Sequence, residues 1–514
     1  MLTTTAIDSG TYGLDFRYSD TEPWTYRIKN IPPDWEEHAV RDFLSDRVFH
    51  QDEVTFTEIV QISMARDCTL AFPQVALLTL RGLVPEILLP LRKNLVEPEK
   101  FKTSVTVPAS SSPGDRHHRH HYTRDIYFDC EFLGLTPVYQ PDDMDNRTAD
   151  IIAVSGLEGH PYGSWQGKQE KLMWLRHFPK IEGSTMERLR TITYGWKSNI
   201  YAQNLWRDRY YNHASYRERF LEELDKLLKC GRDKLKPLIF VGHSYGGILI
   251  MDAVVQASKF PDRYGPISKL IAGFVFFAVP YDGMYVDDLR ACVPDGTFSD
   301  LLDTVDQVKT RPDLQRIRES FSDLVRKTKI QVQTFRETEP TKMLTKVNGK
   351  LRRGGHSIMV INVQSSSLGL PVEFERVIEA DGKDHSDIVK YDRADDSTLQ
   401  SARASLQRIL DARAEKANTS NEHDQSIQGK ELEKFRHAWH LHIPLGKIFS
   451  LKLIFEYIFM LGDIISLTVS FTVWTKSEAK KTPQNKTEGF TVHGQPDLEP
   501  ESFPVQPPPA KPQE

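Results

Sequence analysis

Continuous apolar runs alternate with amphipathic segments through residues 145–412. Asp150–Val154 and Leu238–Val241 lack the polar alternation of a half-exposed strand, which indicates strands that are buried on both faces. Tyr216–Lys229 instead repeats apolar residues at helical spacing. Strands that alternate with helices over about 270 residues predict a doubly wound α/β sheet. Its remaining strands are expected at Leu189–Tyr194, Gly273–Val279, Ile330–Phe335 and Val372–Glu379.

A different pattern precedes this region, and residues 21–140 predict a separate small α+β module. Alternation at Tyr26–Ile31 indicates a strand, and Asp34 with Glu37 forms a capping box that begins a helix. The β-α-β-β-α-β order of the module resembles the RNA-recognition-motif fold. Its third strand carries no aromatic pair on which bases stack, so we expect a structural or docking module and no nucleic-acid partner. The other expected elements are strands at Val54–Ser63, Val75–Leu80 and Asp125–Phe132 and a helix at Val84–Leu91.

Polar composition returns after Leu410, and residues 413–441 predict a linker. Residues 442–475 form the most apolar stretch of the chain and predict a membrane anchor. Within Tyr457–Trp474, Ile, Leu, Phe and Val residues favour insertion by about 0.3–0.6 kcal/mol each, whereas Asp463 opposes it by about 2.5–3.5 kcal/mol. We therefore expect a hairpin or interfacial anchor, and a buried helix pair is the alternative. Residues 1–20 and 476–514 predict a disordered leader and tail.

Length and composition narrow the classes of protein that fit. A chain of 514 residues is too long for one hydrophobic core. The net charge of −5 arises from mixed charges, which gives no indication of a nucleic-acid partner. The N-terminus lacks the cationic flank and apolar centre of a signal or transit peptide, so we expect the α/β region to face the cytosol. Neither a zinc site nor a disulfide framework is expected, because no Cys-x-x-Cys pair occurs among Cys68, Cys130, Cys230 and Cys292.

The turn after Leu238–Val241 carries the strongest chemical signal. Residues 242–246 read Gly-His-Ser-Tyr-Gly, and a helical pattern begins directly after them. Strand, tight turn and helix in that order form a nucleophile elbow, in which the serine hydroxyl is exposed above the sheet. Gly242 and Gly246 let the helix pass close to the strand. Ser244 is therefore the predicted nucleophile, and a tight turn in another α/β sheet is the alternative.

A serine nucleophile requires a base that accepts its proton and an acid that orients the base. In the α/β-hydrolase order, the acid and then the histidine follow the later strands. His385 follows the last predicted strand and is the predicted base. Glu337 follows the strand before it and is the predicted acid, with Asp282 as the alternative. The charged insertion Met284–Lys329 lies between two strands at this edge and predicts a lid.

Several motifs occur in an order that resembles one family. DIIAVSGLEGHPYGSW at residues 150–165, GHSYGG at 242–247, TFRET at 334–338 and DHSD at 384–387 resemble serine esterases and lipases that include the serine-active-site-containing phosphatidylglycerol-remodelling proteins. The region is also similar to the GPI inositol-deacylase-like group and to hydrolase domains that fungal signalling proteins carry before NACHT or ankyrin regions. The resemblance covers roughly residues 120–412. It implies an α/β-hydrolase fold and an acyl-ester substrate, with a lipid as the expected class.

The resemblance also indicates an oxyanion loop after the strand Asp150–Val154. The family's loop reads His-Gly-Leu-Gly-Gly, and here Ser155 and Glu158 replace the histidine and one glycine. The backbone N–H groups of Leu157 and Tyr245 are the expected oxyanion donors, because side chains do not supply them. A carboxylate at Glu158 opposes a developing negative charge unless it points to water.

The sequence thus favours a serine esterase or lipase that acts by acyl transfer to Ser244, with no cofactor and no metal. The alternative is a signalling or scaffold protein whose hydrolase domain is catalytically weak or inactive, although the chain carries no P-loop and no repeats. The expected location is the cytosolic face of an intracellular membrane, of the endoplasmic reticulum or the mitochondrion, and the cytoplasm is the alternative.

Overall fold

The computed structural model describes residues 23–49, 57–70, 73–82, 85, 88, 91, 102–108, 121–180, 186–198, 212–230, 234–292, 299–309, 312–347, 350–431, 439–445, 449–460 and 463–475. The chain divides into two units, residues 1–413 and 414–514. The predicted disordered leader and tail lie outside the described residues.

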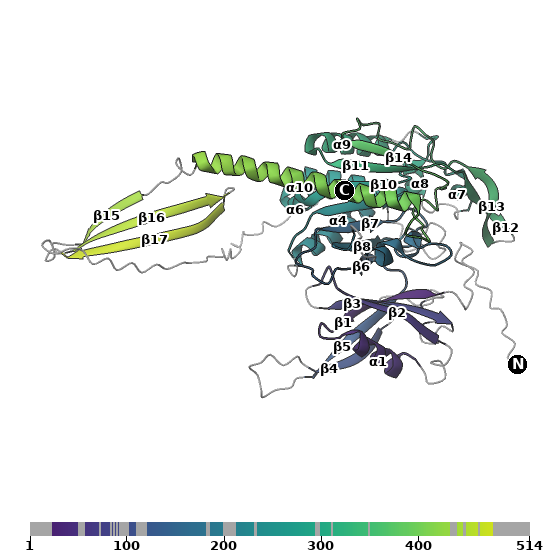
Figure 1. Ribbon diagram of the computed structural model, residues 1–514, viewed down its shortest axis with the longest axis horizontal. Helices are drawn as coiled ribbons and strands as arrows, with labels where there is room; N and C mark the ends of the chain where they lie inside the picture. Colours follow the sequence, from purple (N-terminus) through teal and green to yellow (C-terminus); the bar gives the residue numbers. More distant parts are fainter. Residues whose placement is uncertain are drawn as a thin grey trace, which may run out of the picture. The chain divides into compact units, whose positions relative to one another are not determined.

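A seven-stranded sheet forms the centre of the first unit (Figure 1). Its order is β14 (Glu375–Ala380), β11 (Gln331–Glu337), β10 (Ile271–Phe277), β9 (Leu238–His243), β7 (Ala149–Val154), β8 (Leu189–Gly195) and β6 (Gly134–Tyr139). Neighbouring strands are parallel except β8 and β6, which are antiparallel. Every residue of β7, β8, β9 and β10 is buried, as the apolar runs of β7, β9 and β10 predict, and β8 also buries Arg190, Thr191 and Thr193. The mostly parallel sheet with helical connections is the α/β-hydrolase arrangement.

The helices of this unit connect the strands. Helix α9 (Pro312–Thr328) buries an apolar stripe, and its Phe321 ring lies 4.9 Å from that of Phe274 on β10. The predicted lid over Met284–Lys329 is therefore wrong for the second half of this segment. Helix α9 packs its apolar stripe against the core of the sheet and does not form part of a lid. The other described elements are α3 (Trp174–His177), α4 (His213–Lys229), α5 (Tyr245–Lys259), α6 (Pro261–Leu270), α7 (Asp287–Cys292), α8 (Ser299–Val305), the hairpin β12 (Thr341–Val347) and β13 (Lys350–Ile358), α10 (Ser397–Glu431), and 3₁₀ turns η3 (Gly163–Trp165) and η4 (Phe178–Lys180).

The N-terminal module is a five-stranded antiparallel sheet. Its order is β2 (Thr57–Arg66), β3 (Gln74–Gly82), β1 (Trp24–Ile31), β5 (His121–Asp129) and β4 (Lys102–Pro108), with helix α1 (Glu37–Arg47). Tyr26, Ile28 and Leu78 are buried in one core cluster with Val40 and Leu44 of α1. Most of the predicted helix Val84–Leu91 lies outside the described residues. Residues 134–139, which the sequence places at the end of this module, form β6 of the seven-stranded sheet instead.

Helix α10 continues to Glu431, through residues 414–431 that composition predicts as a linker. Its polar second half carries no proline, so nothing ends the helix there. In the second unit, the predicted apolar segment forms an antiparallel sheet of β15 (Trp439–Leu445), β16 (Phe449–Met460) and β17 (Asp463–Thr475). In the part of the chain that the structure describes, no helix has the length and hydropathy of a membrane span.

Candidate active site

Ser244 stands between β9 and α5, where the sequence predicts a nucleophile elbow. Its backbone has φ 52° and ψ −129°, a strained conformation for a residue with a side chain. The Ser244 N–H donates to the carbonyl of Phe277 on β10 at 2.9 Å, and the Gly247 N–H donates to the Ser244 carbonyl at 3.0 Å. These hydrogen bonds fix the turn at the carboxyl ends of two central strands.

Two glycines make this turn sterically possible. A Cβ on Gly246 would lie 2.3 Å from the carbonyl oxygen of Val154, and a Cβ on Gly156 would lie 2.7 Å from the Ser244 Cβ. Both neighbours belong to rigid parts of the site, so neither can move aside for a methyl group. The loop that follows β7 is therefore packed directly against the serine.

Two hydrogen bonds connect the three residues that the sequence predicts as a triad. His385 Nε2 lies 3.0 Å from Ser244 Oγ, and His385 Nδ1 lies 2.7 Å from Glu337 Oε2. Glu337 ends β11 and is 5% exposed, while the His385 side chain is 13% exposed. The His385 N–H also donates to Thr341 Oγ1 at 2.9 Å, which ties its loop to the start of β12. This geometry permits proton transfer from the serine to a histidine oriented by a carboxylate.

The two candidate acids occupy different positions. Glu337 bonds His385 with one carboxylate oxygen and accepts the Ile361 N–H at 3.0 Å with the other. Asp282 is exposed, and its backbone N–H donates to Ser365 Oγ at 2.9 Å. The structure therefore brings Glu337 to the histidine, and its role as the acid stays a prediction.

The predicted oxyanion loop is held by hydrogen bonds from several directions. Trp196 Nε1 donates to the Ser155 carbonyl at 3.0 Å, and the Glu158 N–H donates to the Ser198 carbonyl at 3.0 Å. His160 Nδ1 accepts the Gly163 N–H at 2.9 Å. Burial lowers the His160 pKa, which keeps Nδ1 unprotonated and able to accept this hydrogen bond. Leu157 directly follows Gly156, which lies against Ser244, and Tyr245 directly follows Ser244, so their role as the two oxyanion donors stays a prediction. A rigid pair of donors beside the nucleophile is what an oxyanion hole requires.

His243 is a site residue that the sequence reasoning did not single out, although it lies inside the elbow motif. Its Nε2 lies 2.8 Å from the His385 carbonyl, and the two imidazole rings are 5.3 Å apart. Burial, together with the nearby His385, lowers the His243 pKa to about 3. A neutral Nε2–H donor therefore fixes the loop that carries His385.

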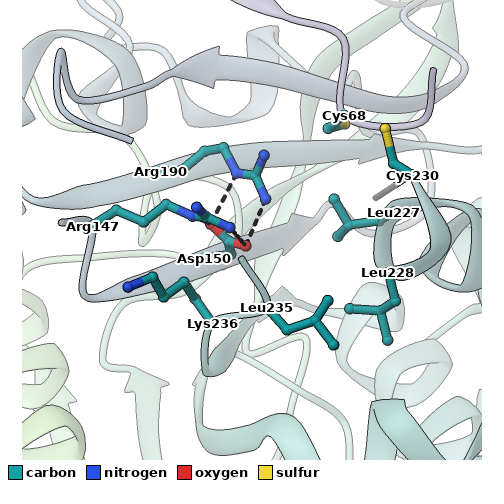
Figure 2. A pocket seen from close by; sticks show the side chains of 9 residues that line it. All are labelled: Cys68, Arg147, Asp150, Arg190, Leu227, Leu228, Cys230, Leu235 and Lys236. Atoms are coloured by element: carbon teal, nitrogen blue, oxygen red, sulfur yellow. Dashed lines mark hydrogen bonds and ion pairs between the residues drawn. The ribbon is translucent and has the colours of Figure 1, made fainter. Parts of the chain in front are cut away.

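A second cluster of ionisable groups lies at the amino ends of β7 and β8, at the edge of the sheet opposite to Ser244. Asp150 accepts from Arg147 at 2.8 Å and from Arg190 at 2.6 Å, and Figure 2 shows the carboxylate between the two guanidinium groups. The adjoining cavity holds about 10 Å³, which is room for roughly one water molecule. It is too small for an ester substrate. Among the described residues, no group of three or more His, Cys, Asp and Glu side chains is arranged to hold a metal ion.

No family model matches the chain. In sequence it is similar to Protein SERAC1 of Danio rerio, with 26% identity over 266 residues that cover 48% of this chain and 37% of the relative. Protein SERAC1 of Homo sapiens is 25% identical over 235 residues, which cover 43% of this chain and 34% of the relative. The matched region spans little more than a third of these relatives.

Among solved structures, the chain is similar to Bacillus licheniformis lipase BlEst2 in its mature form, with a TM-score of 0.34, 11% identity and coverage of 54% of this chain and 97% of that one. Phospholipase PlaB from Legionella pneumophila has a TM-score of 0.33 and 12% identity, and the match covers 65% of this chain and 87% of that one. The assignment to the α/β-hydrolase fold rests on the strand order and on the turn at Ser244.

Proposed function

We propose that the protein is a serine hydrolase that cleaves an acyl ester through Ser244, His385 and Glu337. One observation carries the proposal, namely the pair of hydrogen bonds of 3.0 and 2.7 Å that join the serine, the histidine and the glutamate in that order. The strained backbone of Ser244 supports it, because a conformation that costs free energy persists where the surrounding structure imposes it.

In this mechanism Ser244 Oγ attacks the acyl carbonyl carbon while His385 Nε2 takes the hydroxyl proton. Glu337 stabilises the imidazolium that forms, and the N–H groups of Leu157 and Tyr245 stabilise the oxyanion. His385 then gives its proton to the leaving alkoxide, which leaves an acyl group on Ser244. Water deprotonated by His385 attacks that acyl group and releases the carboxylic acid.

A lipid ester is the substrate class that we propose. The resemblance of residues 120–412 to lipid esterases and lipases supports this choice. The apolar sequence of β16 and β17 supports the further proposal that the second unit associates with the cytosolic face of an intracellular membrane. An enzyme held at a bilayer meets its lipid substrate without extracting it into water.

A fluorophosphonate probe, which reacts with activated serines, tests the chemistry. We expect labelling of the wild-type protein and complete loss of labelling in Ser244→Ala. Ser258→Ala, which removes a serine near the end of the helix that follows Ser244, is the matched control and should label normally. His385→Ala should lower hydrolysis of p-nitrophenyl esters by about 10³-fold or more, because the base is lost. Labelling that persists in Ser244→Ala would contradict the proposal.

A catalytically weak or inactive scaffold is the second candidate function, and one observation favours it. Glu158 follows Leu157 in the oxyanion loop with φ 55°, a backbone conformation that favours the glycine of the family's loop. A carboxylate on the oxyanion loop raises the barrier to oxyanion formation when its side chain points toward the developing charge. Absence of label on folded wild-type protein would decide for the scaffold.

Membrane association has its own test. Full-length protein should remain with membranes during a carbonate wash, whereas the chain truncated after Arg413 should be released. The apolar residues of 439–475 supply the binding free energy, which is lost with them. Equal release of both proteins would assign the segment to a soluble sheet.

A further inference from the structure

A line of hydrogen-bonded side chains begins at the residue next to the nucleophile. The Tyr245 hydroxyl lies 2.8 Å from His213 Nδ1. His213 Nε2 lies 3.1 Å from Asp252 Oδ2, and Arg217 Nη1 donates to the same oxygen at 3.0 Å. None of these four side chains has a part in the mechanism described above.

Two helices place the four side chains opposite each other. Tyr245 and Asp252 are seven residues apart on α5, and His213 and Arg217 are four residues apart on α4. Both spacings bring side chains to one face of a helix. The facing stripes of α4 and α5 therefore form one half-buried polar network between the two helices. Polar groups between packed helices cost free energy unless each of them is hydrogen-bonded. A network of this kind therefore calls for a structural or functional explanation.

The protonation states follow from the contacts. Burial opposes ionisation of Asp252, but hydrogen bonds and charges from His213 and Arg217 lower its pKa below the ordinary value. The Asp252 carboxylate accepts a hydrogen bond from His213 Nε2–H, which leaves Nδ1 of the same ring to accept from the Tyr245 hydroxyl. Burial raises the pKa of Tyr245, so the hydroxyl keeps its proton, with Thr304 of α8 also beside it.

The Tyr245 ring is fixed along its length as well as at its end. It is fully buried, and the Trp196 ring stacks on it at 5.6 Å and 28°. Trp196 also donates to the Ser155 carbonyl of the oxyanion loop. The side chain of Tyr245 thus connects the network to both halves of the predicted oxyanion hole.

We propose that His213 and Asp252 are positioning residues that act through the Tyr245 side chain. Anchoring that side chain fixes the strained Ser244–Tyr245 peptide, and so aims the Tyr245 N–H at the oxyanion. The proposal rests on the function proposed above for Ser244. Its physical basis is that an oxyanion donor is effective only when it is oriented before the charge develops.

Three variants of the full-length protein separate this role from ordinary stability. Tyr245→Phe removes the anchored hydroxyl, and His213→Gln removes the ring Nδ1 that lies 2.8 Å from it. Tyr216→Phe is the matched control, because Tyr216 is also buried, packs against Trp196 at 4.9 Å and donates its hydroxyl to the Lys197 carbonyl at 2.9 Å. Each of the three variants loses hydrogen bonding in a half-buried position, but only Tyr245→Phe and His213→Gln interrupt the network.

We expect Tyr245→Phe and His213→Gln each to lower kcat on p-nitrophenyl esters about tenfold, with KM changed less than about twofold. The double variant should lose little more than either single variant, because both changes break the same connection. Tyr216→Phe should keep its kcat. Fully multiplicative losses in the double variant, or an equal loss in the control, would overturn the inference.

Hydrogen exchange supplies a readout that needs no activity. The peptide spanning residues 242–249 should exchange faster in Tyr245→Phe and His213→Gln than in wild type, and at the wild-type rate in Tyr216→Phe. Unchanged exchange in the first two variants refutes the positioning role, whether or not the protein turns over ester. Absence of Ser244 labelling in the wild type, by contrast, refutes the proposed hydrolase function. In that case the exchange rates of residues 242–249 still decide whether His213 and Asp252 position Tyr245.

Discussion

Glu337 is fixed at both of its carboxylate oxygens, and this distinguishes it from a carboxylate that merely lies near a histidine. One oxygen faces the His385 ring and the other accepts a backbone N–H from the segment after β13. An acid held at two points keeps the imidazole proton on Nδ1, so that Nε2 can accept the proton of the serine hydroxyl. Asp282, on the loop after β10, is exposed to solvent instead.

Glu337→Gln should therefore lower kcat by about 10³-fold or more, since an amide neither stabilises imidazolium nor holds the same tautomer. Asp282→Asn should change kcat by less than about threefold. Steady-state hydrolysis of p-nitrophenyl esters measures both, and equal thermal stability of the two variants is the control. A larger effect of Asp282→Asn would move the acid to that loop.

At the scale of single residues, the candidate catalytic residues could be predicted from the sequence, but the residues that contact and hold them could not. Ser244, His385 and Glu337 each follow a strand in the expected order, so position in the sequence was enough to propose them. His243 contacts His385, which is 142 positions away, and His213 contacts Tyr245, which is 32 positions away. No local pattern in the sequence encodes such contacts.

The elbow is an element whose packing leaves no room for a side chain beside the serine. A Cβ on Gly246 would lie 2.3 Å from the Val154 carbonyl oxygen and 2.6 Å from that of Ser155, and backbone atoms cannot move aside as the end of a flexible side chain can. Helix α6 contains the opposite case, because a Cβ on Gly265 would meet no heavy atom within 4 Å.

Gly246→Ala should destabilise the protein by about 3 kcal/mol or more and abolish labelling of Ser244, since the methyl group forces α5 away from β7. Gly265→Ala should change stability by less than about 1 kcal/mol, because its Cβ meets no packed neighbour while the following Pro266 offsets the helix preference of alanine. Urea unfolding of the two variants gives the comparison. Similar stabilities would show that the elbow tolerates a displacement.

Elements with a continuous apolar sequence were predictable, and elements at the margins of the sheet were not. The central strands β7, β9 and β10 lie close to the expected ranges. Strand β6 contains Pro137, which argues against a strand, but an edge strand leaves one side without hydrogen bonds and tolerates proline. The hairpin β12–β13 is polar and cationic, so it lacks the alternation that marks a half-buried strand.

At the scale of the whole first unit, the N-terminal sheet is covered on both faces. Ile28 and Leu78 face the core with α1, while Leu77 lies in the core cluster of the hydrolase sheet. Arg176 of α3 is buried and donates to Ser63 Oγ at 2.8 Å, and its neighbour His177 contacts Gln61 Oε1 at 3.2 Å. The face on which RNA-recognition motifs stack bases is packed against the hydrolase part, which favours a docking role for the module.

This arrangement could not be predicted from the hydrophobic pattern. Gln61, Ser63 and Thr79 are polar and alternate with apolar residues, so they indicate a strand with one face in solvent. They are instead the acceptors for Arg176 and His177. A polar contact between two parts of a chain has the same sequence pattern as an exposed surface, and only the fold distinguishes them.

The same contact makes the stability of the molecule depend on pH. Burial, and next the charge of Arg176, lower the pKa of His177 from 6.5 to about 4. The Met173 N–H donates to Nδ1 at 2.9 Å, which a protonated ring would not accept. Between about pH 6.5 and pH 4 the unfolded chain therefore binds a proton at His177 that the folded protein refuses. Stability is complete above pH 6.5 and falls as the pH is lowered through this window.

His177→Gln keeps a neutral side chain but removes this proton. The loss of unfolding free energy between pH 7 and pH 5 should be smaller in the variant than in wild type by about 2 kcal/mol. Urea unfolding at the two pH values measures the difference, and His38→Gln, at an exposed histidine of α1, is the matched control that should behave as wild type. An identical pH dependence in His177→Gln would mean that the ring is protonated within the fold, and hence that the contact between the module and α3 is open to water.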